Sequence, residues 1–272
     1  MLKIDLEVSL DATLGCGQAH RWVYGNGTWT GFISNRPIRL KQLDAGLECH
    51  GDVSRDAIHS YFRHEDDIPD IMREISIDGH MSRLVRSCPG MRILRQERWE
   101  CLATYILATN VNVKRIRSMV ETVCNVFGKD LGGRGAFPTP TEILDRQGRI
   151  GECRLGFRDK RLICLADAVE SGSVDLGLIG DLDYAGCVRE LQGIHGVGPK
   201  VADCVALFSF DHLCAFPVDV RISKAMENVY GISGSYAEVS RVGRDMFGRF
   251  AGYAQELLYH SDHIQAPGLV LR

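Results

Sequence analysis

The chain has 272 residues, of which 45% are hydrophobic and 25% are charged, and its formal net charge is -3. This balance is that of one large or two modest soluble domains, and it excludes a polycation and a chain that is wholly disordered, collagen-like or coiled-coil. The apolar runs are too short to span a bilayer and the first residues lack the apolar block of a signal peptide, so we expect no membrane partner. The ten cysteines form no CxxC pair, which favours free buried thiols in a reducing compartment.

The N-terminal part of the chain has the period-two pattern of strands, with apolar residues alternating from Leu2 to Leu10. Further strands are predicted between glycine-containing turns, at residues 28–33, 38–43 and 47–50. Short helices are predicted next, over residues 54–63 and 69–76. We therefore expect an antiparallel β domain with short helices over residues 1–90.

From residue 91 onward the apolar period becomes that of helices. Thr139, Pro140 and Glu142 are spaced as a helix start with a cap, a first-position proline and a glutamate three residues after the cap. The last helices are predicted at residues 183–192, 199–209, 220–229, 236–247 and 250–260. The expected fold class is therefore α+β, with a helical domain over 91–190 and a second helical region over 191–272 that packs with it.

A glycine turn separates two of these helices in the segment LQGIHGVGPKVAD, residues 191–203. Its glycines let the backbone approach a ligand closely, and the helix that Pro199 opens presents free N–H groups at its positive end. Phosphate is the natural ligand of that geometry. The pattern is typical of a helix-hairpin-helix, and the alternative is a plain corner between two helices.

Two charged residues follow the turn. Lys200 lies in the first turn of the second helix, where the dipole and burial would both lower its pKa and make the amine a nucleophile toward a sugar carbon. The alternative is a lysine that grips a phosphate. Asp219 stands at a later helix start, so it is an N-cap, a carboxylate that stabilises an oxocarbenium-like sugar, or both.

This arrangement resembles the helix-hairpin-helix superfamily of base-excision DNA glycosylases and, within it, the 8-oxoguanine DNA glycosylases. Similarity to motifs of that family extends over most of the chain, at residues 17–22, 91–96, 100–116, 155–158 and 254–262. The resemblance implies a bifunctional DNA N-glycosylase and abasic-site lyase. Lys200 would attack C1′ of the sugar, release 8-oxoguanine and cleave the strand by β-elimination through a Schiff base, while Asp219 would stabilise the sugar cation.

The resemblance also implies which residues meet the DNA. The carbonyl of Gly17 would accept a hydrogen bond from the N7–H that 8-oxoguanine has and guanine lacks, and the rest of the base pocket would comprise Cys204, Gln255, Tyr259 and Asp262. Asn110 would fill the space left by the flipped nucleotide, Arg115 would read the opposite cytosine, and Phe157 would wedge the base stack. The other residues expected to contact DNA are Arg158, His195, Gly196, Val197, Gly198 and Arg221.

The implied partner is double-stranded DNA with an oxidised guanine opposite cytosine, bound by a monomer. No cofactor is required, although the resemblance implies a structural monovalent cation at the hairpin carbonyls of residues 193–198. Cys214 is the last cysteine, so the four-cysteine iron–sulfur cluster of endonuclease III and the adenine glycosylases is excluded, and no other metal site is expected.

Two alternatives remain at this stage. One is a helix-hairpin-helix glycosylase for another damaged base such as an alkylated purine, although the 3-methyladenine glycosylases lack the nucleophilic lysine. The other is a non-catalytic DNA-binding module, which would have no use for Lys200 and Asp219 together. The segment between Val220 and the final helix is shorter than in eukaryotic members, which is typical of a compact prokaryotic version. Together with the free cysteines, this predicts an intracellular protein, cytoplasmic and nucleoid-associated if it is prokaryotic.

Overall fold

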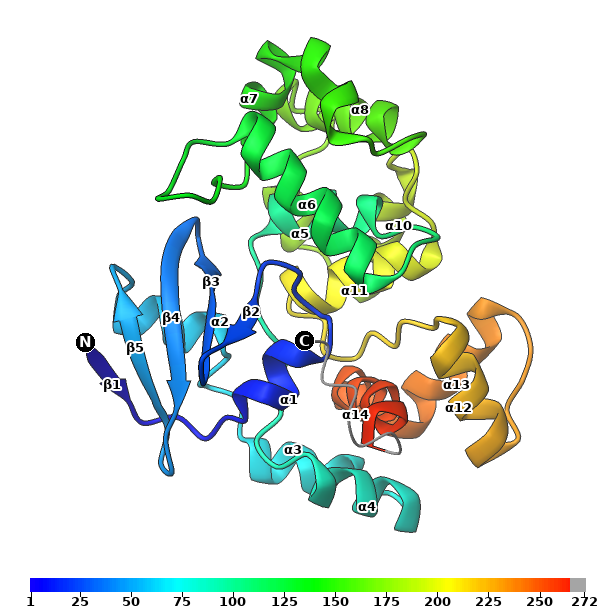
Figure 1. The fold of residues 1–272 in the computed structure, drawn as a ribbon. Helices are drawn as coiled ribbons and strands as arrows, with labels where there is room; N and C mark the ends of the chain where they lie inside the picture. The colour runs from blue at the N-terminus through cyan, green and yellow to red at the C-terminus, as the bar shows by residue number, and fades with distance from the viewer. Residues whose placement is uncertain (265–272) are drawn as a thin grey trace.

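The computed structural model describes residues 1–264, with side chains described to residue 260. It places a five-stranded antiparallel sheet beside a larger helical part (Figure 1). The strand order is β1-β5-β4-β3-β2. The strands are β1 (Leu2–Ile4), β2 (Val23–Gly25), β3 (Thr28–Ile33), β4 (Arg36–Gln42) and β5 (Leu47–Gly51). The α+β class predicted from the sequence is confirmed.

The first predicted strand is wrong beyond Ile4. Ile4 pairs with Leu47, the first residue of β5, so the residues after Ile4 have no partner with which to continue the ladder. The Ser9 hydroxyl instead accepts a hydrogen bond from the Ala12 N–H and caps helix α1 (Leu10–Gly15), which the sequence pattern did not predict. The alternating residues Leu6 and Val8 are nevertheless buried.

The helical part agrees closely with the predicted periodicity. The predicted capping box is present, because Thr139 and Glu142 each bond the other's backbone N–H through their side chains. No helix within residues 1–264 is long and apolar enough to cross a membrane. The helices and 3₁₀ turns are α2 (Arg55–Tyr61), α3 (Ile68–Ile75), α4 (Gly79–Ser87), α5 (Arg98–Leu107), α6 (Val113–Phe127), α7 (Pro140–Asp145), η1 (Gln147–Cys153), α8 (Arg158–Glu170), α9 (Leu176–Gly180), α10 (Tyr184–Gly193), α11 (Pro199–Ser209), α12 (Val220–Tyr230), α13 (Tyr236–Phe247), η2 (Gly248–Phe250) and α14 (Ala251–Ile264).

Two apolar cores organise the molecule, and they do not follow the predicted boundaries. The sheet and α2 share one core, whereas α3 and α4 belong to the core of the remaining helices. The reason is the apolar face of α3, which packs against the C-terminal helix α14 far along the chain (Figure 1). The predicted boundary at residue 190 falls inside α10, which packs against α11.

The loop after α1 is fastened where the two cores meet. Gln18 donates from Nε2 to the Arg92 carbonyl at 2.9 Å and accepts from the Leu94 N–H at 2.8 Å. The Gln18 carbonyl in turn accepts from Gln96 Nε2 at 2.7 Å. These bonds hold residues 16–18 against the segment that links the sheet to the helices, which fixes the position of Gly17.

We expect Gly31→Ala to destabilise the fold by about 1–3 kcal/mol, the usual cost of overpacking a core. A Cβ at Gly31 would lie 2.4 Å from Cε3 of Trp22, a fully buried ring whose Nε1 donates to the Tyr61 hydroxyl. Thermal unfolding measures the loss. Gly25→Ala, with open space around its added methyl group, is the matched control. Equal unfolding temperatures for the two variants would contradict the close approach of Trp22.

Candidate active site

The predicted hairpin is present between α10 and α11. The Val197 N–H bonds the Ile194 carbonyl at 3.0 Å to close the turn, and Gly196 adopts a φ of +89°, which favours glycine. Gly198 caps α11 without a side chain, so the first turn of that helix is open to an anion. His195 and Gly198 are exposed at the turn, whereas Val197 is buried. The expected monovalent cation at these carbonyls stays a prediction.

A cavity of about 130 Å³ brings most of the predicted catalytic and base-binding residues together. Helices α11 and α14, the Asp219 turn and the loop after α1 all contribute to its walls. The predicted residues that line it are Gly17, Lys200, Cys204, Asp219, Gln255 and Tyr259. Asp262 lies outside the residues whose side chains are described.

Lys200 is half-buried at the cavity wall, with Nζ 5.3 Å from the centre of the Tyr105 ring. Its pKa is raised, first by charge on the Cys204 sulfur and, against the lowering effect of burial, by the Asp219 carboxylate. Burial raises the pKa of the Cys204 thiol itself to about 12, so at neutral pH the carboxylates supply the negative charge that faces Lys200. The predicted lowering of the Lys200 pKa is therefore wrong, because it counted the dipole and burial but neither Cys204 nor the carboxylates that folding brings in. The amine must lose a proton before it can attack.

Asp219 caps α12, as predicted. One of its carboxylate oxygens, Oδ1, accepts from the backbone N–H groups of Arg221 and Ile222, each at 2.9 Å. Those bonds fix the carboxyl group at the cavity, opposite Lys200. The same side chain can therefore serve both the helix start and a developing positive charge.

Gly17 has a φ of +96°, the left-handed region that favours glycine. Its carbonyl accepts no hydrogen bond from any residue that the structure describes, whereas the next carbonyl, that of Gln18, is bonded by Gln96 and by the Tyr105 hydroxyl. A Cβ at Gly17 would meet only Cγ2 of Val113 at 3.8 Å, an ordinary contact. The glycine is therefore required by its backbone conformation and not by lack of space.

Gln255 and Tyr259 approach the cavity from α14. Gln255 is buried and its Oε1 has no partner within the described chain, so an acceptor is available to a ligand. The Arg221 guanidinium lies over the Tyr259 ring, 5.0 Å from its centre. Tyr259 lines the cavity, and Arg221 lines a wider groove beside it. Arg221 was predicted to contact DNA and is exposed where it could do so.

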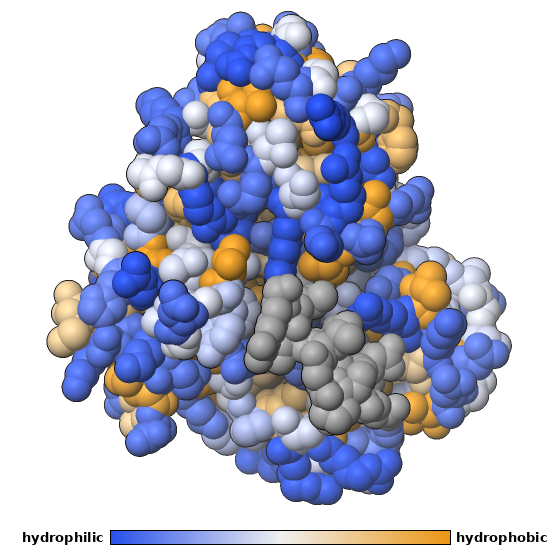
Figure 2. Space-filling model, viewed as in Figure 1, coloured by the Kyte–Doolittle hydropathy of each residue, from blue (hydrophilic) through white to orange (hydrophobic). Residues whose placement is uncertain are grey.

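A wider groove of about 1100 Å³ opens onto the cavity and shares Lys200 and Asp219 with it. Asn110, at a φ of +56°, lines this groove together with Arg161, which the sequence analysis missed. The visible face of the molecule is mostly hydrophilic, with small dispersed hydrophobic areas (Figure 2). The cationic side chains of Arg161, Arg221 and Lys224 line this groove and can meet the phosphates of a nucleic-acid backbone.

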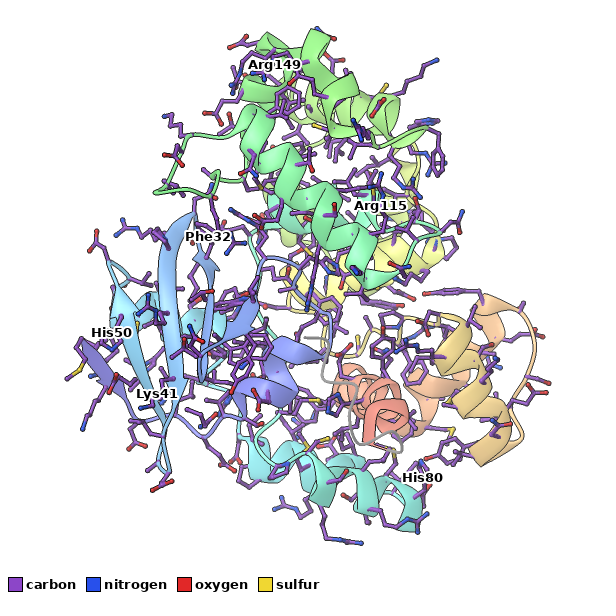
Figure 3. The ribbon with its side chains drawn as sticks, viewed as in Figure 1. Phe32, Lys41, His50, His80, Arg115 and Arg149 are labelled. Carbon is purple, nitrogen blue, oxygen red and sulfur yellow. The ribbon has the colours of Figure 1, made fainter. Side chains whose placement is uncertain are left out.

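The other predicted DNA contacts divide into exposed and structural residues. Phe157 is 53% exposed, and the Arg161 guanidinium lies 4.7 Å from its ring centre. Arg115, at the start of α6, donates to the Arg154 carbonyl at 2.7 Å (Figure 3). Arg158 is buried and donates to the carbonyls of Thr109 and Leu155, so it supports the turn that carries Asn110. Its DNA contact stays a prediction.

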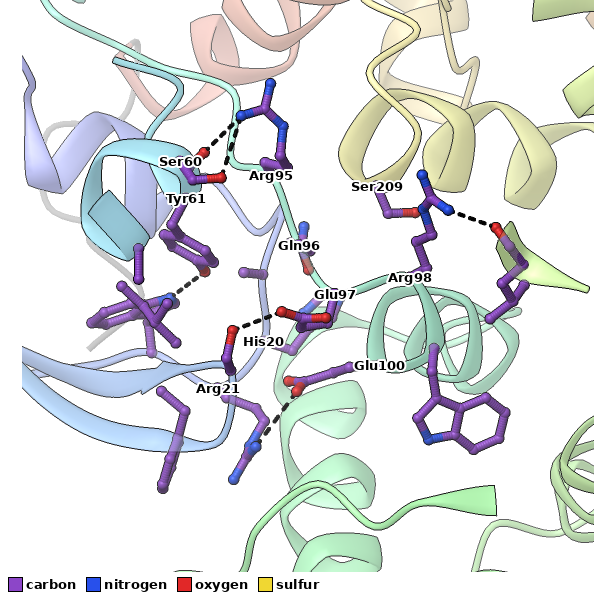
Figure 4. Close-up of a pocket in the computed structure, with 18 of the residues that line it drawn as sticks. His20, Arg21, Ser60, Tyr61, Arg95, Gln96, Glu97, Arg98, Glu100 and Ser209 are labelled. Atoms are coloured by element: carbon purple, nitrogen blue, oxygen red, sulfur yellow. Dashed lines mark hydrogen bonds and ion pairs between the residues drawn. The ribbon is translucent and has the colours of Figure 1, made fainter. Parts of the chain in front are cut away.

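A second cavity, of about 610 Å³, lies between the sheet and the helices (Figure 4). Most of its polar groups are paired with one another, including Arg21 with Glu100 and the Ser34 hydroxyl with Glu97. Its side chains therefore tie the two parts of the molecule together. Within the described chain no group of three or more His, Cys, Asp or Glu residues is placed to hold a metal ion.

Sequence reasoning missed two polar side chains of the smaller cavity, the one that contains Lys200 and Asp219. His20 is buried beside Tyr105 with both ring nitrogens unpartnered among the described residues, and burial lowers its pKa to about 3. Glu256 is buried with Oε2 unpartnered. The available signal for Glu256 was a single acid on the buried face of an otherwise apolar stretch of α14, while nothing in the sequence distinguished His20.

Comparisons with known proteins agree with this geometry. Residues 1–102 match the family model of the N-terminal domain of 8-oxoguanine DNA glycosylases. An N-glycosylase/DNA lyase of Saccharomyces cerevisiae is 30% identical over 263 residues, which cover 84% of this chain and 70% of the yeast protein. The corresponding protein of Arabidopsis thaliana is 29% identical, with 93% of this chain and 77% of that protein covered.

A solved structure is similar over nearly the whole chain. It is the 8-oxoguanine glycosylase/lyase of Clostridium acetobutylicum in complex with double-stranded DNA that contains cytosine opposite 8-oxoguanine. The TM-score is 0.89 at 29% identity, with 96% of this chain and 93% of that chain covered. Fold, cavity and sequence identity together show that this chain belongs to the family of 8-oxoguanine DNA glycosylase/lyases.

Proposed function

We propose that this protein excises 8-oxoguanine from duplex DNA and then cleaves the strand at the resulting abasic site. The observation that carries the proposal is the position of Lys200 and Asp219 in one small cavity beside the hairpin, with the free Gly17 carbonyl on the opposite loop. A DNA-binding module without chemistry has no need of a lysine and a carboxylate in one small cavity.

The chemistry follows from these two side chains. The Lys200 amine attacks C1′ of the flipped nucleotide as the glycosidic bond breaks, and the Asp219 carboxylate stabilises the positive charge that develops on the sugar. Ring opening gives a Schiff base between Lys200 and C1′. Loss of a proton from C2′ then expels the 3′-phosphate, which is β-elimination and cleaves the strand.

Base recognition rests on the loop and on α14. The Gly17 carbonyl, which accepts no hydrogen bond from the described residues, can accept one from the N7–H of 8-oxoguanine, whereas guanine would place a lone pair against it. The free Oε1 of Gln255 can accept from the Watson–Crick edge, and Tyr259 offers a ring for stacking. We further propose that Asn110, Arg115 and Phe157 meet the duplex around the extruded base, with cytosine opposite, and that the protein acts as a monomer.

The test of this function is a substrate panel with sodium borohydride. Duplexes with 8-oxoguanine opposite cytosine, an alkylated purine, or undamaged guanine are incubated with the wild-type protein. We expect base release and a covalent protein–DNA adduct with the first duplex only, because borohydride reduces the Schiff base of Lys200. Release of the alkylated purine without an adduct would instead identify a glycosylase of the other class.

We expect Gly17→Ala to lower the single-turnover rate of 8-oxoguanine excision by about 10-fold to 100-fold, as the loss of a recognition contact worth about 1–3 kcal/mol would. Alanine at a φ of +96° is strained, so the turn shifts and moves the carbonyl away from the base. The affinity for a duplex with an abasic-site analogue, which has no base to read, should change little. An equal fall in both measurements would make Gly17 a folding residue.

A further inference from the structure

The cavity holds a second carboxyl group, Glu256, that the reaction above leaves unused. It follows Gln255 on α14, is 5% exposed and lines the same cavity as Lys200 and Asp219. Its Oε2 has no hydrogen-bond partner among the described residues. Burial of an unpartnered carboxyl group costs free energy, so its presence among the buried apolar residues of α14 requires a functional reason.

The surroundings of Glu256 bring its pKa close to neutral pH, so the side chain can both accept and donate a proton there. Burial raises its pKa to about 7, the Asp219 charge acts in the same direction, and a contact with the Cys16 thiol and the charge of Lys200 act against it. Asp219, the other carboxylate of the cavity, is held by two backbone N–H groups. Two carboxyl groups in such different environments suit two different roles, one in proton transfer and one in charge stabilisation.

We propose, resting on the function proposed above, that Glu256 carries the proton of the Lys200 ammonium to the leaving base. The ammonium first gives a proton to the Glu256 carboxylate, which leaves a neutral amine. The C1′–Nζ bond then forms while the C1′–N9 bond breaks, and the electron pair of the broken bond goes to the base. Glu256 gives its proton to that base and becomes a carboxylate again. The products are a neutral base and a protonated secondary amine on the sugar, so charge is conserved.

The groups around Glu256 support this direction of transfer. Lys200 provides the proton, and Asp219 keeps its own oxygen bonded to the start of α12. The other titratable side chains of the cavity are thiols, phenols and His20. Burial raises the pKa values of the thiols and phenols and lowers that of His20 to about 3, so all of them stay neutral at pH 7 and do not compete for the proton. The charged and titratable groups that act on Glu256, or on which it acts, are Cys16, Tyr105, Lys200, Cys204, Asp219 and Tyr259.

The test is the pH dependence of single-turnover 8-oxoguanine excision by wild type and by Glu256→Gln, which keeps the shape and removes the acid. The carboxylate is the proton acceptor, so the wild-type rate should rise as pH passes about 7 and then level off. The variant should excise about 10²-fold more slowly at neutral pH, the usual contribution of a positioned acid–base group, and should lack the inflection. Its unfolding temperature and its affinity for an abasic-analogue duplex should match wild type.

Glu100→Gln is the matched control. Glu100 is a carboxyl group with a pKa raised by burial, but it pairs with Arg21 at the other cavity, so this variant should retain both the rate and the inflection. A Glu256→Gln variant with unchanged rate would overturn the proposal, as would a slower variant that keeps the inflection, because Glu256 would then only pack or contact the base. A wild-type protein that binds the lesion but never releases 8-oxoguanine would refute the proposed function itself.

Discussion

Lys200→Gln is expected to abolish base release and borohydride trapping, with a loss of roughly 10⁴-fold or more, the scale seen when a covalent nucleophile is removed. The amide keeps the length and polarity of the side chain but cannot form a Schiff base. Lys200 is half-buried in the catalytic cavity, and the wide groove is lined by many other residues, so affinity for duplex DNA should persist. The measurements are single-turnover excision, adduct formation and binding to an abasic-analogue duplex.

A lysine far from the cavity provides the control. Lys41 is exposed on β4 of the sheet, so Lys41→Gln should trap DNA as wild type does (Figure 3). Adduct formation that survives in Lys200→Gln would assign the covalent step to another amine of the chain.

Asp219→Asn is expected to fold almost normally and to excise 8-oxoguanine about 10²-fold to 10³-fold more slowly, the scale of a lost electrostatic contact in the transition state. Asparagine caps helices about as well as aspartate, so the bonds to the Arg221 and Ile222 N–H groups can remain while the negative charge is lost. Asp219→Ala should lose the cap as well, at a cost of about 1 kcal/mol of folding free energy. Single-turnover kinetics and thermal unfolding separate the two contributions.

The control for this prediction is the same aspartate-to-asparagine substitution at a helix N-cap that takes no part in catalysis. Asp67 caps α3 by accepting from the Asp70 N–H at 3.0 Å, and it is exposed outside the catalytic cavity. Asp67→Asn should leave excision unchanged. A near wild-type rate in Asp219→Asn would reduce Asp219 to a helix cap.

The catalytic lysine shows where local reasoning reached its limit. Its position at the start of α11 followed from the glycine turn and Pro199, because those residues act on their immediate neighbours. Its ionisation did not follow, because the local pattern took no account of Cys204 one turn along the helix, or of the Asp219 carboxylate, which reaches Lys200 only through the fold. A pattern that describes one helix cannot state which charges another segment brings opposite it.

Arg158, which was predicted as a site residue, and Glu256, which was missed, show the same limit of local sequence patterns. The family resemblance implied a DNA contact for Arg158, whose guanidinium turns inward to the carbonyls of Thr109 and Leu155. Glu256 was missed because helical periodicity assigns positions to faces and does not say which face lines a cavity. Where each side chain lies depends on the part of the fold that packs against its helix, and the local sequence does not state this.

The sequence by itself determined the α+β class, the helices from residue 183 onward to within a few residues, the hairpin and the family resemblance, because apolar periodicity, caps and glycine turns are local properties. The tertiary structure decided which remote segments of the chain contact one another. It ended β1 where β5 offers no further partner, placed α3 and α4 on the distant α14, and fixed Gly17 through Gln18. It also placed Lys200 in one cavity with two carboxyl groups. Contacts between remote segments, and the burial that they cause, are set by packing and not by neighbours in the chain.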